Sequence, residues 1–222
     1  MQYMIRRVTT APALDGNWDA PHWRRADTAD IATFRPEGSA HRPRVRTRWL
    51  YCSRALHGVF HVEDRYVRSV RTAFNEMVCK DSCVEAFLEP PGSRGYVNFE
   101  CNCGGTLLAS HITDPTRVPG GFKQFTRLSK ADGDRVGVYH SMPQVVDPEI
   151  TTPVTWIVQL RIPFALFERY TGPVGDPSGT TWRGNFYKCG DETSHPQWAS
   201  WSPVSALNFH LPACFGEVSF EQ

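Results

Sequence analysis

The sequence of 222 residues lacks any run of about 18 consecutive apolar residues, the length that a membrane-spanning helix requires. It also lacks an excess of charge, since 24 Lys and Arg stand against 23 Asp and Glu, and it therefore offers no basic surface for nucleic acid. The first residues, MQYMIRRVTTAPALDG, contain no apolar signal segment. We expect a protein that contacts neither membrane nor nucleic acid and lies in the cytoplasm. If a signal peptide has been removed from the chain, the protein lies instead in the periplasm or outside the cell.

The cysteines form no C-x-x-C pair, and their odd number without a signal segment favours free thiols in a reducing compartment. Cysteine is among the most buried residue types, so these thiols are expected to fill the core. The four cysteines from Cys79 to Cys103 match the number of ligands that zinc takes, but their spacing fits no zinc finger or ribbon, and we expect no zinc site. The seven are Cys52, Cys79, Cys83, Cys101, Cys103, Cys189 and Cys214.

Motifs of the common enzyme classes are also absent. The chain contains no G-x-S-x-G elbow, no Walker A loop, no H-E-x-x-H and no G-x-G-x-x-G. The eight histidines are scattered, and we expect His195 and His210, in the C-terminal loops, to form hydrogen bonds rather than to bind metal. We expect no cofactor; a structural calcium ion is the one metal left open.

The sequence does contain short apolar runs that are separated at regular intervals by proline and glycine. Hydrophobic residues make up 41% and charged residues 21%, which is typical of globular proteins, and 17 prolines and 17 glycines are spread along the chain. Apolar runs recur about every ten residues, which predicts an antiparallel β-sandwich forming a single domain over residues 1–222. A helical turn is expected at Pro163. The predicted strands are Val45–Cys52, His57–Val62, Cys83–Leu88, Tyr96–Cys103, Arg135–His140, Thr155–Ile162, Thr181–Cys189 and Gly216–Phe220.

Two of these strands alternate clearly enough to assign their faces. Even-numbered positions are apolar in Cys83–Leu88, and odd-numbered positions are apolar in Tyr96–Cys103. The turn residues Pro90-Pro91-Gly92-Ser93 between them predict an antiparallel hairpin. Pairing then places the other faces of both strands on one side of the sheet. The predicted patch consists of Glu85, Asn98, Glu100 and Asn102, with Tyr96 and Phe87 at its rim.

Carboxylates and amides beside aromatic rings suit a neutral, hydroxyl-rich ligand such as a sugar, since rings stack on the apolar faces of a pyranose. The alternative is an ordinary solvated sheet face, whose outward positions are polar in any case. Further aromatic residues, Trp198, Trp201 and Phe209, occur in the loop segment 190–211, where binding residues of a sandwich concentrate.

An enzymatic function also stays open. Glu85 and Glu100 lie on neighbouring strands and could serve as the acid and base of a glycoside hydrolase, whose two carboxyls lie about 5–10 Å apart.

Eight segments between about Leu14 and Phe220 form a combination that is more specific than any one of them. They are LDGNWDAPHW, RTRWLYCSRALHGVFHVED, VCKDSCVEAFLEP, YVNFECNCGGTLLAS, WIVQLRIPF, WRGNFYKCGDE, SWSP and FHLPACFGEVSF. Together they resemble carbohydrate-binding module family 9, most closely its stand-alone, family 9-like branch. The resemblance implies an antiparallel β-sandwich of the DOMON-like group, whose members bind sugars or haem, and a non-catalytic module that can assist glycoside hydrolysis. A haem site of the DOMON-like kind would use Met77 with a histidine such as His61 or His140.

The resemblance also implies site residues for the end of a glucose, cellobiose or xylo-oligosaccharide chain. The family's binding Glu corresponds to Glu85, and polar positions on the next strand correspond to Asn98 and Glu100. Two tryptophans clamp the sugar in the family, and their positions are occupied here by Cys79 and Phe209, so Trp198 or Trp201 would have to supply a replacement ring. The expected partner is a carbohydrate; the oligomeric state is left open.

Overall fold

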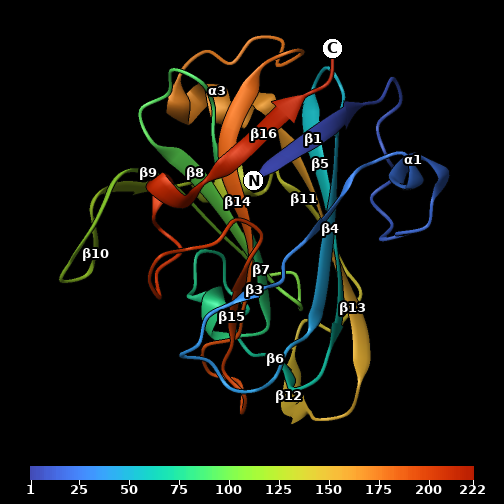
Figure 1. Cartoon of the computed structure of the whole chain (residues 1–222), viewed down its shortest axis with the longest axis vertical. Coiled ribbons are helices and arrows are strands. Elements are labelled where there is room, and N and C mark those ends of the chain that lie inside the picture. Colours follow the sequence, from blue (N-terminus) through green and yellow to red (C-terminus); the bar gives the residue numbers. More distant parts are fainter.

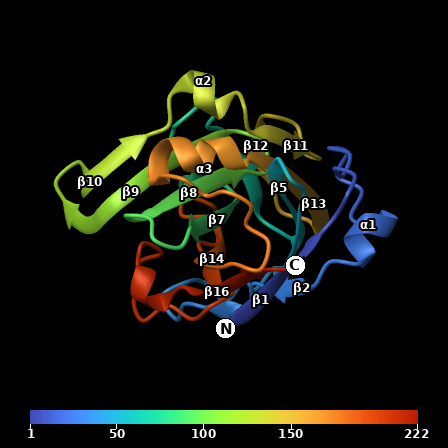
Figure 2. The ribbon, with the colours of Figure 1, turned by 90° about the horizontal axis from the view of Figure 1, so that it is seen from above.

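The computed structural model describes residues 1–222, which form two β-sheets packed face to face (Figures 1 and 2). The first sheet contains, in spatial order, β10 (Gly121–Arg127), β9 (Leu107–Val118), β8 (Tyr96–Asn102), β7 (Cys83–Glu89), β14 (Thr181–Cys189), β16 (Gly216–Phe220) and β1 (Gln2–Arg7). The second contains β4 (Arg44–Tyr51), β5 (Ala55–Asp64), β13 (Val154–Pro163) and β11 (Gly137–His140), with β2 (Thr28–Asp30) beside β4. The sandwich is therefore confirmed.

Strand β1 joins the two sheets, because residues 2–5 pair in parallel with β16 and the last two residues, Arg6 and Arg7, pair in parallel with β4. All other pairs in the two sheets are antiparallel. The remaining elements are short: β3 (Thr33–Phe34), β6 (Val67–Ser69), β12 (Val146–Ile150), β15 (Trp198–Ser200), α1 (Pro21–Arg24), α2 (Lys130–Gly133), α3 (Phe164–Thr171) and the 3-10 turns η1 (Val78–Lys80) and η2 (Pro212–Cys214). No helix has both the length and the apolar character needed to cross a membrane.

All eight predicted strands are present, and helix α3 starts directly after Pro163, as predicted. Helix α3 packs against β8 of one sheet and β13 of the other, and it covers one end of the sandwich (Figure 1). Eight strands were not predicted, among them β1 and the long hairpin β9–β10. This hairpin forms one edge of the first sheet, and its tip projects from the sandwich (Figure 2). It contains Pro115, a residue that weakens a strand prediction.

The hairpin of β7 and β8 has the predicted register. Glu85 pairs with Glu100, and Phe87 pairs with Asn98. The alternating apolar residues of both strands enter the core between the sheets, whereas Cys83, Phe87 and Tyr96 join a second cluster on the outer face, beneath the C-terminal loops. Both faces of this sheet are therefore buried, and the predicted polar patch lies at the bottom of a covered site rather than on an open surface.

An ion pair lies inside the core between the sheets. Lys188 of β14 pairs with Val84 of β7, so its side chain points inward, where its Nζ lies 3.4 Å from Oδ2 of Asp64 on β5. Asp64 also accepts hydrogen bonds from Trp156 Nε1 at 3.1 Å and from the Arg65 backbone at 2.7 Å. Burial alone would raise the pKa of Asp64, but Lys188 and the hydrogen bonds outweigh it and hold that pKa below its ordinary value. The Lys188–Asp64 pair therefore links the two sheets.

Candidate functional site

A pocket of about 480 Å³ lies on the outer face of the first sheet, above β7, β8, β9 and β14. Strand residues form its floor, because alternate side chains of these strands point away from the core. The walls come from three segments that are distant in sequence: the residues around η1, the β9–β10 hairpin, and the C-terminal loops from Gly190 to Leu211. The floor residues are Glu85, Asn98, Glu100, Leu108, Ser110 and Cys189.

The polar groups of the floor are held in fixed orientations. The Asn98 amide donates to Oε1 of Glu100 at 2.6 Å, and its Oδ1 accepts from the Ser110 backbone at 2.9 Å. Glu85 accepts from the thiol of Cys189 at 3.0 Å. Glu85 and Glu100 are only 2% and 5% exposed, so the pocket presents few but well-ordered acceptors.

Burial also sets the charge of the floor. Desolvation raises the pKa of Glu100 to about 7, although the hydrogen bond from Asn98 opposes the rise. Desolvation, with the nearby Glu100 as a second cause, raises the pKa of Glu85 well above its ordinary value. Burial raises the pKa of Asp191 at the wall in the same way. Burial therefore shifts all three carboxyls towards the protonated form, in which a carboxyl can donate as well as accept hydrogen bonds.

Two aromatic rings stand on the C-terminal wall. Trp198, at the start of β15, donates from Nε1 to Oδ1 of Asp191 at 2.7 Å, which fixes both side chains. Phe209 stacks on Tyr187 of β14, with ring centroids 4.1 Å apart and planes 14° apart, and the Tyr187 hydroxyl donates to the Phe209 carbonyl. These contacts orient Trp198 and Phe209 before any ligand arrives, which lowers the entropic cost of binding.

The β9–β10 hairpin supplies the opposite wall. Phe122 and Phe125 are in edge contact at 5.7 Å, and the guanidinium of Arg117 lies 4.2 Å from the centre of the Phe122 ring. Phe125 is 38% exposed, and Met77 and Leu207, on other segments of the rim, are 48% and 44% exposed. Exposed large apolar side chains that gather at one pocket mouth are a common mark of a binding site.

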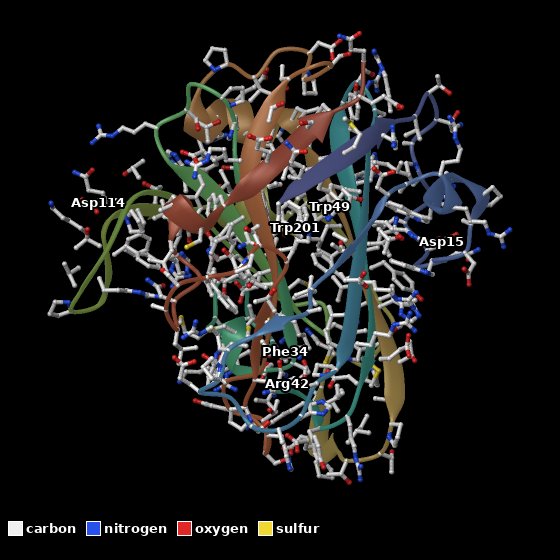
Figure 3. The ribbon with its side chains drawn as sticks, in the orientation of Figure 1. Asp15, Phe34, Arg42, Trp49, Asp114 and Trp201 are labelled. Atoms are coloured by element: carbon white, nitrogen blue, oxygen red, sulfur yellow. The ribbon has the colours of Figure 1, made fainter.

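Five of the eight predicted site residues converge on this pocket: Cys79, Glu85, Asn98, Glu100 and Phe209. The other three do not line it. Tyr96 lies below it, buried, with its hydroxyl 2.8 Å from Nδ1 of His210, and Asn102 is buried against Asp81 and the Thr106 backbone. Trp201 lies in the core between the sheets, near Trp49 (Figure 3). Of the two candidate replacement rings, Trp198 lines the pocket and Trp201 does not.

Sequence reasoning missed the hairpin wall and Asp191. Asp191 follows directly after β14, at a position with no pattern to single it out. The hairpin did have a signal, since Pro119-Gly120-Gly121 is typical turn chemistry between two segments with aromatic or β-branched residues. Missing this hairpin leaves out a whole wall of the pocket, which is lined by Arg117, Phe122, Phe125 and Arg127.

The alternative metal and haem sites do not assemble as grouped from the sequence. Cys101 and Cys103 belong to the core between the sheets, on the opposite side of the sheet from Cys83. Met77 lines the pocket, but neither His61 nor His140 does. His195 stacks on Tyr66 with ring centroids 3.6 Å apart, and its Nδ1 lies 2.9 Å from Ser194 Oγ. The Nδ1 of His210 lies 2.8 Å from the Tyr96 hydroxyl, so both histidines form the predicted hydrogen bonds.

A β-sandwich whose sheet face and loops enclose a polar pocket with aromatic walls has the architecture of a ligand-binding module. A model of carbohydrate-binding family 9 matches residues 22–220, and the chain belongs to this family. None of the curated proteins matches the chain.

Three solved structures resemble the chain over nearly its whole length. A candidate carbohydrate-binding protein from Bacteroides uniformis is 28% identical, with a TM-score of 0.86 and 99% of each chain covered. A family 9 module from Caldicellulosiruptor kristjanssonii in complex with cellotriose is 13% identical, with a TM-score of 0.66 and coverage of 100% of this chain and 94% of that one. The same organism's family 9 module in complex with glucose is 14% identical, with a TM-score of 0.62 and coverage of 98% and 95%. The similarity to the two family 9 modules supports the β-sandwich fold of this chain.

Proposed function

We propose that the protein binds the end of a neutral saccharide chain, of the glucose, cellobiose or xylo-oligosaccharide type, without catalysing a reaction. The observation that carries this proposal is the pocket itself: ordered carboxyl and amide groups at its floor and stacking rings at its walls. Membership of carbohydrate-binding family 9, and two modules of similar fold solved with cellotriose and glucose, support it.

Each part of the pocket has a role in this function. Asn98, Glu100 and Asp191 offer donors and acceptors for sugar hydroxyls at fixed positions. Trp198 and Phe209 offer faces for a pyranose ring, and the pocket volume of about 480 Å³ suits one or two sugar rings. Because three sides are walled, a chain end fits the pocket better than the middle of a long polymer.

Truncation of the wall should weaken binding. We expect Phe209→Ala to raise the Kd for cellobiose by about tenfold, since a lost stacking ring costs about 0.5–1.5 kcal/mol beyond its area. Asp191→Ala should raise the Kd by a similar factor, because it removes a hydrogen-bond acceptor and the contact that orients the Trp198 ring. Isothermal titration with glucose, cellobiose and xylo-oligosaccharides measures both.

The matched control is Val145→Ala, an exposed residue that is 53% accessible and outside the pocket, and it should leave the Kd unchanged. Absence of heat with every neutral saccharide at millimolar concentration, from a folded wild-type protein, would refute the proposal.

One observation favours a hydrolase as the second candidate: Glu85 and Glu100 are direct register partners, and the pKa of Glu100 is raised to about 7, as in a general acid. We expect no hydrolysis of aryl glycosides, because burial raises the pKa of both Glu85 and Glu100 and so disfavours the ionised carboxylate that a glycoside hydrolase needs as its nucleophile or base. Release of the aryl group by the wild type, and its loss in Glu100→Gln, would reverse this expectation.

A further inference from the structure

Three metal-binding side chains meet beneath the pocket floor. Cys83 and Glu85 lie two residues apart on the same face of β7, and Cys189 of β14 pairs directly with Cys83. The two sulfur atoms and a carboxylate oxygen of Glu85 all lie within 4.8 Å of one another. All three residues are buried, at 0%, 2% and 1% exposure, so they form an enclosed cluster rather than a surface group.

The charges around this cluster are one-sided. The one hydrogen bond to the Glu85 side chain comes from the Cys189 thiol, a weak donor, and Glu85 takes part in no ion pair. Glu100 pairs with Glu85 across β7 and β8, so two buried carboxyls lie side by side. No basic side chain forms a hydrogen bond or ion pair with Glu85, and a bound cation would supply the missing positive charge.

We propose that Cys83, Glu85 and Cys189 bind a borderline-soft divalent cation of the Zn²⁺ class at the floor of the pocket. Two thiolates and one carboxylate form a donor set that selects zinc over calcium or magnesium, which take oxygen ligands alone. On binding, both thiols and the Glu85 carboxyl, where it is protonated, release their protons to solvent, and the cation replaces them.

The spacing of the donors fits this ion. With Zn–S bonds of about 2.3 Å, ligand atoms of a tetrahedral site lie about 3.5–3.8 Å apart, so shifts of about 1 Å or less close the site. Glu85 and Cys189 line the pocket whereas Cys83 lies beneath it, and the fourth position therefore faces the pocket. Water or a ligand hydroxyl can fill that position. Cys79 also lines the pocket but lies outside the 4.8 Å cluster, so its side chain would have to move towards the ion to bind it.

The test is a titration of the reduced, metal-free, full-length protein with Co²⁺ in the absence of saccharide, so its result is independent of the proposed function. We expect one equivalent to bind with the thiolate-to-cobalt charge-transfer absorption of a tetrahedral site. Cys189→Ser should weaken binding by at least about a hundredfold, as should Glu85→Gln. The matched control, Cys101→Ser, alters a buried thiol on the other face of the sheet and should leave binding unchanged.

X-ray absorption at the zinc edge of the zinc-loaded wild type counts the sulfur atoms bound to the metal, and this measurement does not depend on whether a variant folds. Two sulfur neighbours support an open site, and three support a site that Cys79 completes, in which case Cys79→Ser lowers the count to two. The proposal is overturned if the zinc has fewer than two sulfur neighbours or if the folded wild-type protein shows no charge-transfer band. It is also overturned if Cys101→Ser and Cys189→Ser weaken metal binding equally.

Discussion

Replacement of Lys188 by methionine should lower the free energy of unfolding by about 3–5 kcal/mol. Lys188 is fully buried between the sheets, and Asp64 is buried opposite it. Removal of the ammonium group leaves the Asp64 carboxylate without its lysine partner, and the remaining partners are His41 Nε2 at 2.7 Å, Trp156 Nε1 and the Arg65 backbone. Urea unfolding of the variant and the wild type at pH 7 measures the difference.

Two further variants show whether the cost comes from the unpaired charge. Lys188→Met combined with Asp64→Asn keeps an acceptor for Trp156 but removes the charge, and this double variant should recover part of the lost stability. Lys130→Met breaks an exposed pair with Asp134, and its cost should stay below about 1 kcal/mol. A Lys188→Met protein as stable as the wild type would show that the inter-sheet pair contributes nothing.

Glu100→Gln should stabilise the protein at pH 8 by about 3 kcal/mol and by less than about 1 kcal/mol at pH 5. Burial raises the pKa of Glu100 from 4.5 to about 7. Below about pH 4.5 the carboxyl is protonated in both the folded and the unfolded chain, and it costs nothing. Between about pH 4.5 and 7 only the unfolded chain ionises, so stability falls as pH rises, and above pH 7 the full cost remains. Glutamine removes this cost.

Urea unfolding at both pH values, with Glu217→Gln on the exposed surface as the control, tests this result. Gln can still accept the hydrogen bond from Asn98, so the variant isolates the charge from the contact. A gain that is equal at pH 5 and pH 8 would contradict the pH linkage and would point to a packing effect instead.

Much of the pocket floor was predictable because its geometry is local. Side chains alternate between the two faces of a strand, and Pro90-Pro91-Gly92 closes the β7–β8 hairpin, so the shared face of Glu85, Asn98 and Glu100 follows from the sequence. The same alternation places Asn102 on that face, yet its position at the end of β8 brings it against Asp81 rather than into the pocket.

Contacts between distant segments were not predictable in this way. Alternation along β7 and β8 already separates Cys83 from Cys101, but only the order of strands in the sheet brings Cys189, which is distant in sequence, beside Cys83. Trp198 and Trp201 looked alike in an aromatic loop, and only packing against β14 places the first at the pocket wall and the second in the core.

The sequence by itself determined the sandwich, eight of its strands and the face on which the carboxyl and amide groups lie, because these depend on a two-residue period and on turn residues that act locally. The tertiary structure alone decided that this face is enclosed, that the β9–β10 hairpin and the C-terminal loops wall it, and that Lys188 points into the core. Those features depend on which strands become neighbours, and strand order is set by the burial of the whole chain rather than by any single segment.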